Sequence, residues 1–182
     1  MTARRGVFVF AVILIATLFA DQASKRWAHG LPVRPADCVQ PGELLGARCA
    51  GVPQPVIEGY WDWELAYNPG VAFSTFSSVT GRFGMQVILS ILAAVALCGV
   101  TVLALRTAAG ERWKRAAFAL IAGGALGNLV DRLEDGAVTD FVRWRIHDHR
   151  WPIFNVADAA LLVGVVILML DALWASRRVA TR

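Results

Sequence analysis

Four long apolar stretches dominate the pattern of hydrophobic and polar positions along the chain. They run over about 6–27, 83–105, 113–133 and 154–176. A helix needs about 20 predominantly apolar residues to cross the ~30 Å hydrocarbon core of a bilayer, and each stretch meets that length. The pattern therefore predicts a membrane protein of mainly α class, with four transmembrane helices and a single domain over residues 1–182.

The polar region between the first two stretches, 28–82, has a different period. Over 61–67 apolar side chains alternate with two acidic ones, which is the two-residue period of a strand. Asn, Pro and Gly follow one another at 68–70 and indicate a turn. The segment before the strand, 31–59, contains five prolines and several glycines and is typical of an irregular, insertion-like loop. We therefore expect a small β-sheet outside the membrane.

The aromatic side chains of this strand have two interpretations, which the sequence leaves open. Trp and Tyr are common at the membrane–water interface, so Trp61 and Trp63 fit a simple anchoring role. A small sheet lying on the bilayer could also hold an extended peptide by strand addition at its edge.

Composition and charge place the four helices in a membrane and orient them. Hydrophobic residues make up 57% and charged residues 18% of the chain, and the mean hydropathy is +0.52. Nine of the 18 Lys and Arg residues lie in three short segments, 1–5, 106–115 and 177–182. The positive-inside rule makes these segments cytoplasmic, together with both termini. Because the basic residues are divided among helix ends, the net charge of +4 reflects topology, and we expect no nucleic-acid binding.

Two of the three cysteines lie in the outer loop. Cys38 and Cys49 are separated by ten residues, and an oxidising compartment would allow them to form a disulfide. Two free thiols or a loosely held metal are the alternatives, although no histidine lies near enough to support the metal. Cys98 lies within the second apolar stretch, where we expect an inert packing role.

The polar residues inside the apolar stretches gather at one depth. At about 1.5 Å per residue, Asp21 lies about 22 Å above the start of the first stretch, near the outer surface. The third stretch reaches Asp131 at a similar height, and the fourth begins near Asp158. In the third stretch Gly123, Gly127 and Asp131 recur every fourth residue, so small residues that permit close helix packing lead to a carboxylate.

Most of these charged residues have a purely structural interpretation. Asp21 and Lys25 are four apart on one helix and can form an ion pair, which lowers the free-energy penalty of burying either. A pair between Asp131 and Arg132 could likewise join helices. Asp171, near the basic C-terminal end, is expected to be a snorkelling or capping residue.

Asp140 and Asp158 are the acidic residues that these structural roles leave. They are 18 residues apart, which permits two different elements to direct both carboxyl groups to one point. Two carboxylates that share a site cannot both ionise easily, so one becomes a general acid and the other a general base. A water between them could then attack a carbonyl, with Asn128 and Asn155 orienting the pair and Arg132 holding the fold around it. This arrangement predicts a membrane aspartyl hydrolase.

Two other classes of function are possible from the same residues. A small proton- or ion-coupled transporter also uses buried carboxylates, but it needs them spaced along the depth of the membrane. A non-enzymatic helix bundle would explain the small-residue stripe and would leave Asp140 and Asp158 without a role. A metal site formed by 147–149, which contains two histidines and an aspartate, is a minor possibility.

Five polar motifs follow one another in a fixed order, and together they resemble those of signal peptidase II, the bacterial lipoprotein signal peptidase family. The motifs are DQASK at 21–25, NPGVAFS at 68–74, GGALGNLVDR at 123–132, VTDF at 138–141 and FNVAD at 154–158. One such motif would be weak evidence, whereas five in order on a four-span chain are specific. The resemblance covers the whole chain except 31–59, which looks like an insertion.

The resemblance implies an aspartic endopeptidase of the bacterial inner membrane. Such an enzyme removes the signal peptide from diacylglyceryl-modified prolipoproteins, just before the lipidated cysteine, at the outer face of the membrane. It implies contact with membrane lipids, inhibition by the cyclic peptide globomycin, a periplasmic β-cradle, and no metal or organic cofactor. We also expect a monomer.

The resemblance assigns roles residue by residue. It implies that Asp140 and Asp158 are the catalytic dyad. Residues that match site-shaping and substrate-binding positions are Asn68, Gly70, Asn128, Arg132 and Asn155. Residues that match supporting polar positions are Asp21, Lys25 and Asp131.

Overall fold

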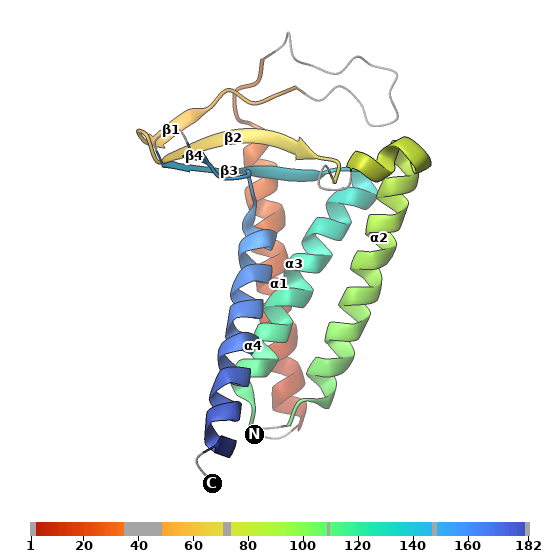
Figure 1. Cartoon of the computed structure of the whole chain (residues 1–182), viewed down its shortest axis with the longest axis vertical. Helices are drawn as coiled ribbons and strands as arrows, with labels where there is room; N and C mark the ends of the chain where they lie inside the picture. Colours follow the sequence, from red (N-terminus) through yellow and green to blue (C-terminus); the bar gives the residue numbers. More distant parts are fainter. Residues whose placement is uncertain (1–2, 35–48, 71–73, 109, 147–148, 181–182) are drawn as a thin grey trace.

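The computed structural model describes residues 3–34, 49–70, 74–108, 110–146 and 149–180. Four long helices form a bundle, and a small sheet lies across one of its ends (Figure 1). The helices are α1 (Ala3–Ala28), α2 (Ser74–Arg106), α3 (Arg112–Glu134) and α4 (Val156–Ala180).

The four-helix prediction is confirmed, since each helix contains a segment long and apolar enough to cross a membrane. The chain enters the bundle and leaves it at the end opposite the sheet (Figure 1). The largest difference concerns α2, which begins at Ser74 rather than near residue 83. The apolar pattern marks only the part of α2 that could lie in lipid, Gln86–Arg106, and the first turns of the helix precede it.

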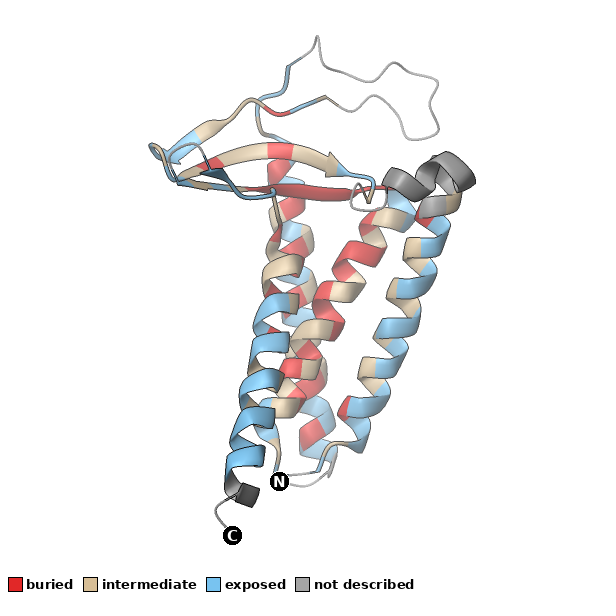
Figure 2. Ribbon diagram, viewed as in Figure 1, coloured by how far each residue is buried: buried red, intermediate tan, exposed pale blue. Residues whose placement is uncertain are grey.

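Helix α3 is the centre of the bundle and packs against the other three helices. Figure 2 shows buried residues concentrated along α3, whereas α2 and α4 are largely exposed along their length. Its glycines allow this packing. A Cβ atom at Gly123 would lie 2.7 Å from Thr17 Cβ of α1, and one at Gly124 would lie 2.5 Å from the Ala157 carbonyl oxygen of α4. The small-residue stripe thus brings two backbones against α3.

This packing predicts that Gly124→Ala separates α3 from α4 and destabilises the protein by about 1–3 kcal/mol, because the added methyl meets backbone that cannot move aside. Gly99→Ala on α2 is the matched control, since a Cβ there would meet no atom within 4 Å. The control should be neutral or slightly stabilising. Thermal unfolding of both variants in detergent micelles measures the difference, and equal midpoints would contradict the packing argument.

The sheet has four antiparallel strands in the order β1-β2-β3-β4. They are β1 (Gln54–Ile57), β2 (Trp61–Asn68), β3 (Val138–Ile146) and β4 (His149–Arg150). The small sheet expected outside the helices is confirmed, with β2 at the predicted strand. The loop prediction for 31–59 is wrong at its end, because 54–57 form β1. This is an edge strand, where a proline such as Pro55 is tolerated.

An aromatic cluster joins the sheet to the end of α1. The ring centroids of Trp27 and Trp63 lie 5.1 Å apart, and those of Trp63 and Phe141 lie 5.9 Å apart. Leu65 is buried in the same cluster. The apolar face predicted for β2 therefore packs on α1 and β3, which fixes the height of β3 above the bundle.

The acidic side chains of β2 are held by arginines of β3. Asp62 pairs with Arg145 at 3.1 Å, and Glu64 pairs with Arg143 at 2.5 Å. Asp62 is almost fully buried, so the acidic face of β2 is not exposed to solvent at this residue. These cross-strand ion pairs reinforce the backbone hydrogen bonds between β2 and β3 and so help to position β3.

Two predictions involve residues outside the described part of the chain. Cys38 lies there, whereas Cys49 takes part in a disulfide, so the bridge between them stays a prediction. Residues 147 and 148 of the possible metal site also lie outside the described residues.

The third cysteine differs from its prediction. Cys98 is free and exposed on α2 rather than packed inside.

Candidate active site

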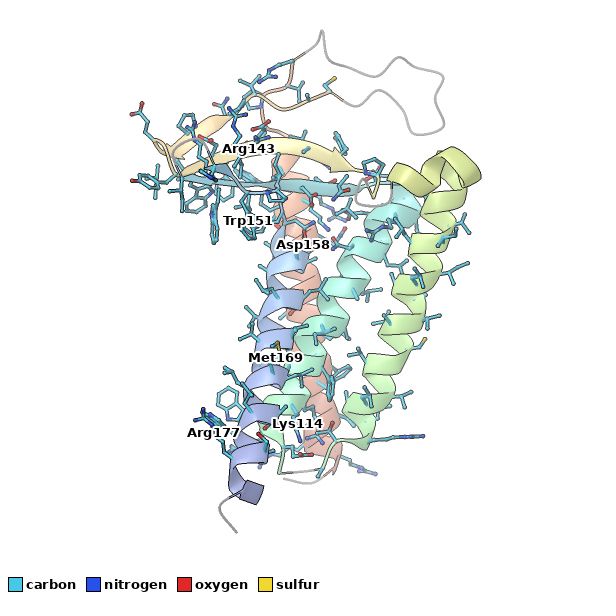
Figure 3. The ribbon with its side chains drawn as sticks, viewed as in Figure 1. Lys114, Arg143, Trp151, Asp158, Met169 and Arg177 are labelled. Atoms are coloured by element: carbon cyan, nitrogen blue, oxygen red, sulfur yellow. The ribbon has the colours of Figure 1, made fainter. Side chains whose placement is uncertain are left out.

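Two elements bring the predicted catalytic carboxyl groups together at the sheet end of the bundle. Asp140 lies on β3, and Asp158 lies in the first turn of α4. Figure 3 shows Asp158 just beneath the sheet, far from Lys114 and Arg177 at the other end. Asn155 bonds to both groups: its Nδ2 donates to Asp140 Oδ1 at 2.7 Å, and its backbone N–H donates to Asp158 Oδ2 at 3.3 Å. A single residue thus holds the two carboxyls in one site.

Asn155 holds this position because it caps the N-terminus of α4. Its Oδ1 accepts the backbone N–H of Asp158 at 3.0 Å, while the Asp158 carboxyl accepts the backbone N–H of Asn155. This is a reciprocal capping box, with an aspartate in place of the usual glutamate. The Asn-x-x-Asp spacing therefore starts the helix and orients the carboxyl group at once.

Asn128 of α3 supplies the second donor to Asp158. Its Nδ2 donates to Asp158 Oδ1 at 2.8 Å. Its Oδ1 accepts hydrogen bonds from Lys25 Nζ at 3.0 Å and from Asn155 Nδ2 at 3.2 Å. Because both ends of the amide are occupied, Asn128 can present only N–H to the carboxyl group. The side chain is buried, so it is held in place.

The turn after β2 closes the site over Asp140. Asn68 Nδ2 donates to Asp140 Oδ2 at 3.2 Å, and Asn68 Oδ1 accepts the backbone N–H of Gly70 at 2.9 Å. Gly70 has a φ of +90°, a conformation that other residues rarely adopt. A Cβ there would also lie 2.4 Å from Leu89 Cδ1 of α2. The geometry of the turn, which aims Asn68 at the carboxyl group, therefore requires glycine.

The electrostatic environment of Asp140 favours its neutral form. Burial is the largest effect and the neighbouring Asp158 the second, and together they raise the pKa of Asp140 to about 7. Hydrogen bonds from Asn68 and Asn155 and the charge of Lys25 act in the opposite direction. Near neutral pH, Asp140 can therefore hold a proton beside a second carboxyl group, as the sequence interpretation required.

A buried ion cluster lies directly below the dyad. Lys25 Nζ pairs with Asp21 at 2.8 Å and with Asp131 at 3.0 Å, and all three side chains are almost fully buried. The predicted pair between Asp21 and Lys25 is thus present. The predicted pair between Asp131 and Arg132 is not, because Asp131 faces α1 and bonds to Lys25 there.

The two acids of this cluster hold the backbone of the segments that carry Asp140 and Asp158. Asp21 Oδ1 accepts the N–H of Ala157 at 2.9 Å, and Asp131 Oδ2 accepts the N–H of Thr139 at 2.9 Å. Ala157 directly precedes Asp158, and Thr139 directly precedes Asp140. Each catalytic candidate is therefore anchored, one residue before it, to the buried ion cluster.

Arg132 lies beside the site without a direct bond to either carboxyl group among the described contacts. Its Nη1 donates to the backbone oxygen of Asn128 at 3.1 Å, and its side chain is half-buried. Arg132 is thus placed to attract a polar group into the site. At the far end, Asp171 pairs with Lys114 of α3 at 3.2 Å.

Sequence reasoning missed three residues that support the site. Gln22 Nε2 donates to Asp131 at 2.9 Å, and Thr139 accepts Asn155 Nδ2 through its backbone oxygen at 3.2 Å. His29 Nε2 lies 3.1 Å from Thr139 Oγ1. Gln22 follows Asp21 in the sequence and Thr139 precedes Asp140, and these positions could have indicated their roles. His29 follows Lys25 by one helical turn, but the interpretation of this region as loop concealed that spacing.

Known proteins resemble this chain over most of its length. The family model described as signal peptidase (SPase) II matches residues 13–174. A lipoprotein signal peptidase of Xanthomonas campestris is 41% identical over 175 residues, which cover 95% of this chain and 93% of the relative. A lipoprotein signal peptidase of Xylella fastidiosa is 34% identical over 173 residues, which cover 94% of this chain and 92% of the relative.

The fold also has solved counterparts. Two structures described as a bacterial membrane enzyme, determined by the in meso method, align with TM-scores of 0.73 and 0.71 at 22% and 24% identity. They cover 93% and 92% of this chain and 90% and 94% of their own. At these identities they show the fold alone. The family match over most of the length, together with the identities of the curated relatives, shows that this chain belongs to the signal peptidase II family and is a multi-pass membrane peptidase.

Proposed function

We propose that the protein is an aspartic endopeptidase that cleaves diacylglyceryl-modified prolipoproteins just before the lipidated cysteine. Asp140 and Asp158 form its catalytic dyad. The observation that carries this proposal is the pair of hydrogen bonds from Asn155, which hold Asp140, whose pKa is raised to about 7, and a second carboxyl group at one point. The names of the relatives, lipoprotein signal peptidases, support the substrate class.

The proposed reaction divides acid and base between the two carboxyl groups. Asp158, in its ionised form, takes a proton from a water that attacks the scissile carbonyl carbon, while Asp140 gives its proton to the carbonyl oxygen. The resulting tetrahedral diol collapses when Asp158 returns its proton to the leaving nitrogen. Asp140 regains a proton from a diol hydroxyl, and the C–N bond breaks. The dyad ends the cycle as it began it.

The remaining site residues support substrate binding in this proposal. Asn68 and Gly70 form the turn at the end of β2, beside Asp140, where an extended peptide could bind. Arg132 offers a half-buried cation to polar groups of the substrate. Asn128 and Asn155 keep the carboxyl groups oriented. Globomycin, a cyclic peptide, would compete for the same position.

The membrane placement follows from charge. Lys114 and Arg177 lie at the end of the bundle opposite Asp158 (Figure 3), and this end carries the basic segments of the sequence. The positive-inside rule makes that end cytoplasmic, so the dyad lies at the outer face of the inner membrane. There it meets both lipid, which carries the substrate, and water, which the reaction consumes.

The transporter alternative has no support. Its requirement was a series of acids along the depth of the membrane, whereas the dyad and its supporting acids gather at the sheet end of the bundle. A gel-shift assay with purified protein and a lipidated prolipoprotein tests the peptidase proposal directly. Loss of the signal peptide is the expected result, and an uncleaved substrate would contradict the proposal.

The pKa of Asp140 predicts the alkaline limb of the pH profile. Because Asp140 must be protonated to donate, kcat/KM should fall as the pH rises through about 7. The fall should approach tenfold per pH unit well above that value. In Asn68→Ala the loss of a donor to the carboxylate should raise the pKa, so the fall should begin at higher pH. A midpoint that does not move in this variant would contradict the assignment.

A further inference from the structure

Gln86, near the sheet end of α2, carries a buried amide that the proposed mechanism does not use. Its side chain is 8% exposed, and its Nε2 has no hydrogen-bond partner in the part of the chain that the structure describes. A buried amide N–H without a partner destabilises the folded state. An apolar side chain at this position would make the folded state more stable. The presence of an amide therefore indicates a ligand that accepts a hydrogen bond from it.

The amide faces the interior of the bundle. Leu97, Val100 and Ala104 pack into the core between the helices, and they follow Gln86 by 11, 14 and 18 residues. These intervals are close to whole numbers of helical turns at about 3.6 residues per turn, so all four residues share one face of α2. The two residues after Gln86 are exposed at 41% and 42% and lie on the lipid side.

The height of Gln86 matches the level at which α3 leads into β3. Ala104 of α2 and Ala119 of α3 belong to one core cluster and mark a common depth. At about 1.5 Å per residue, Gln86 lies about 27 Å above that depth, and Glu134 at the end of α3 lies about 22 Å above it. Gln86 is therefore at the sheet end of the bundle, with the candidate active site.

A series of contacts connects this part of α2 to Asp140. Leu89, three residues from Gln86 on the same side of α2, packs against Gly70 so closely that a Cβ there would lie 2.4 Å from Leu89 Cδ1. The Gly70 N–H bonds to Asn68, which donates to Asp140. Gln86 therefore lies one helical turn nearer the sheet than Leu89, the residue that contacts this turn.

We propose that Gln86 positions the substrate by donating a hydrogen bond from Nε2 to one of its carbonyl oxygens. This inference rests on the proposed function. An extended peptide at the lipid surface exposes backbone carbonyls, each of which needs a donor, and the diacylglyceryl group adds ester carbonyls of the same chemistry. Gln86 is a positioning residue, since it takes part in no bond-breaking step.

Steady-state kinetics of Gln86→Leu tests the proposal. Loss of one hydrogen bond to the substrate should raise KM about two- to thirteen-fold and leave kcat within about twofold. The melting temperature should not fall, because the variant removes a buried amide without a partner. Thr101→Val is the matched control on α2: the Thr101 hydroxyl is already bonded to the Leu97 carbonyl at 2.7 Å, so KM should not change.

Two substrates identify the source of the carbonyl. One carries the usual diacylglyceryl ester, and the other an ether-linked dialkylglyceryl group without ester carbonyls. An equal rise in KM with both assigns the bond to the peptide, and a rise with the ester alone assigns it to the lipid; either result supports the proposal. An unchanged KM with both substrates overturns it. If the unmodified protein cleaves both substrates in that experiment, the proposed function stands and only the role of Gln86 falls.

Discussion

Asp140→Asn and Asp158→Asn will each lower the rate of prolipoprotein cleavage at least about 10³-fold. An amide cannot supply the proton that Asp140 gives to the carbonyl oxygen, nor take the proton that Asp158 removes from water. Both effects act on kcat, because the variants keep the shape of the site. Cleavage of a lipidated prolipoprotein by purified protein, followed by gel shift over hours, measures the loss.

Asp171→Asn is the matched control for these variants. Asp171 lies on the same helix as Asp158, is only half-buried and pairs with Lys114 at the opposite end of the bundle. Its substitution should leave the rate within about twofold, since surface ion pairs contribute little. Either dyad variant cleaving at the rate of the unmodified protein, with a melting temperature near normal, would refute the assignment of the dyad.

Lys25→Met should produce the largest loss of stability, about 3–5 kcal/mol. The substitution leaves Asp21 and Asp131, both buried, without the cation that lies between them. It also removes the donor to Asn128 Oδ1, one of the bonds that orient the amide toward Asp158. Thermal or denaturant unfolding in micelles should show the destabilisation, and activity should fall together with it.

Lys114→Met tests the same change in a different environment. Lys114 also contacts two carboxylates, those of Glu111 and Asp171, but its side chain is 34% exposed against 3% for Lys25. Water screens these contacts, so the expected loss of stability is far smaller than that for Lys25→Met. Similar destabilisation by the two variants would mean that burial of the Lys25 cluster does not set its contribution.

The helices and one strand could be predicted because their signals are local. Length and apolarity identify a membrane-spanning helix without its neighbours, and the alternation over 61–67 identifies β2. The strand β3 was overlooked although apolar and basic residues alternate over 142–146, because its first five residues are all buried and show no alternation in burial. The strand β1 has no such signal, since it is a four-residue edge strand with a proline. It depends on pairing with β2, which is tertiary information.

The site was predicted as a set of residues but not as a network. Motif resemblance indicated the dyad and the asparagines, and the structure brings these residues together. The predicted ion pair between Asp131 and Arg132 was wrong, because adjacent residues of a helix point in different directions. Asp131 instead pairs with Lys25 of α1. Gln22 and Gln86 carry no charge and were overlooked, since their importance depends on what surrounds the amide.

The backbone bonds from Asp21 to Ala157 and from Asp131 to Thr139 tie the proposed dyad to the buried ion cluster around Lys25. The two amide hydrogens should therefore exchange with solvent only when the whole protein unfolds, because neither can open without exposing buried charges. We infer that the geometry of the proposed dyad is fixed before a substrate binds. Any conformational change that fits different lipoprotein sequences to the enzyme must then occur in the substrate or at the rim of the site. One fixed pair of carboxyl groups could thus process many substrates.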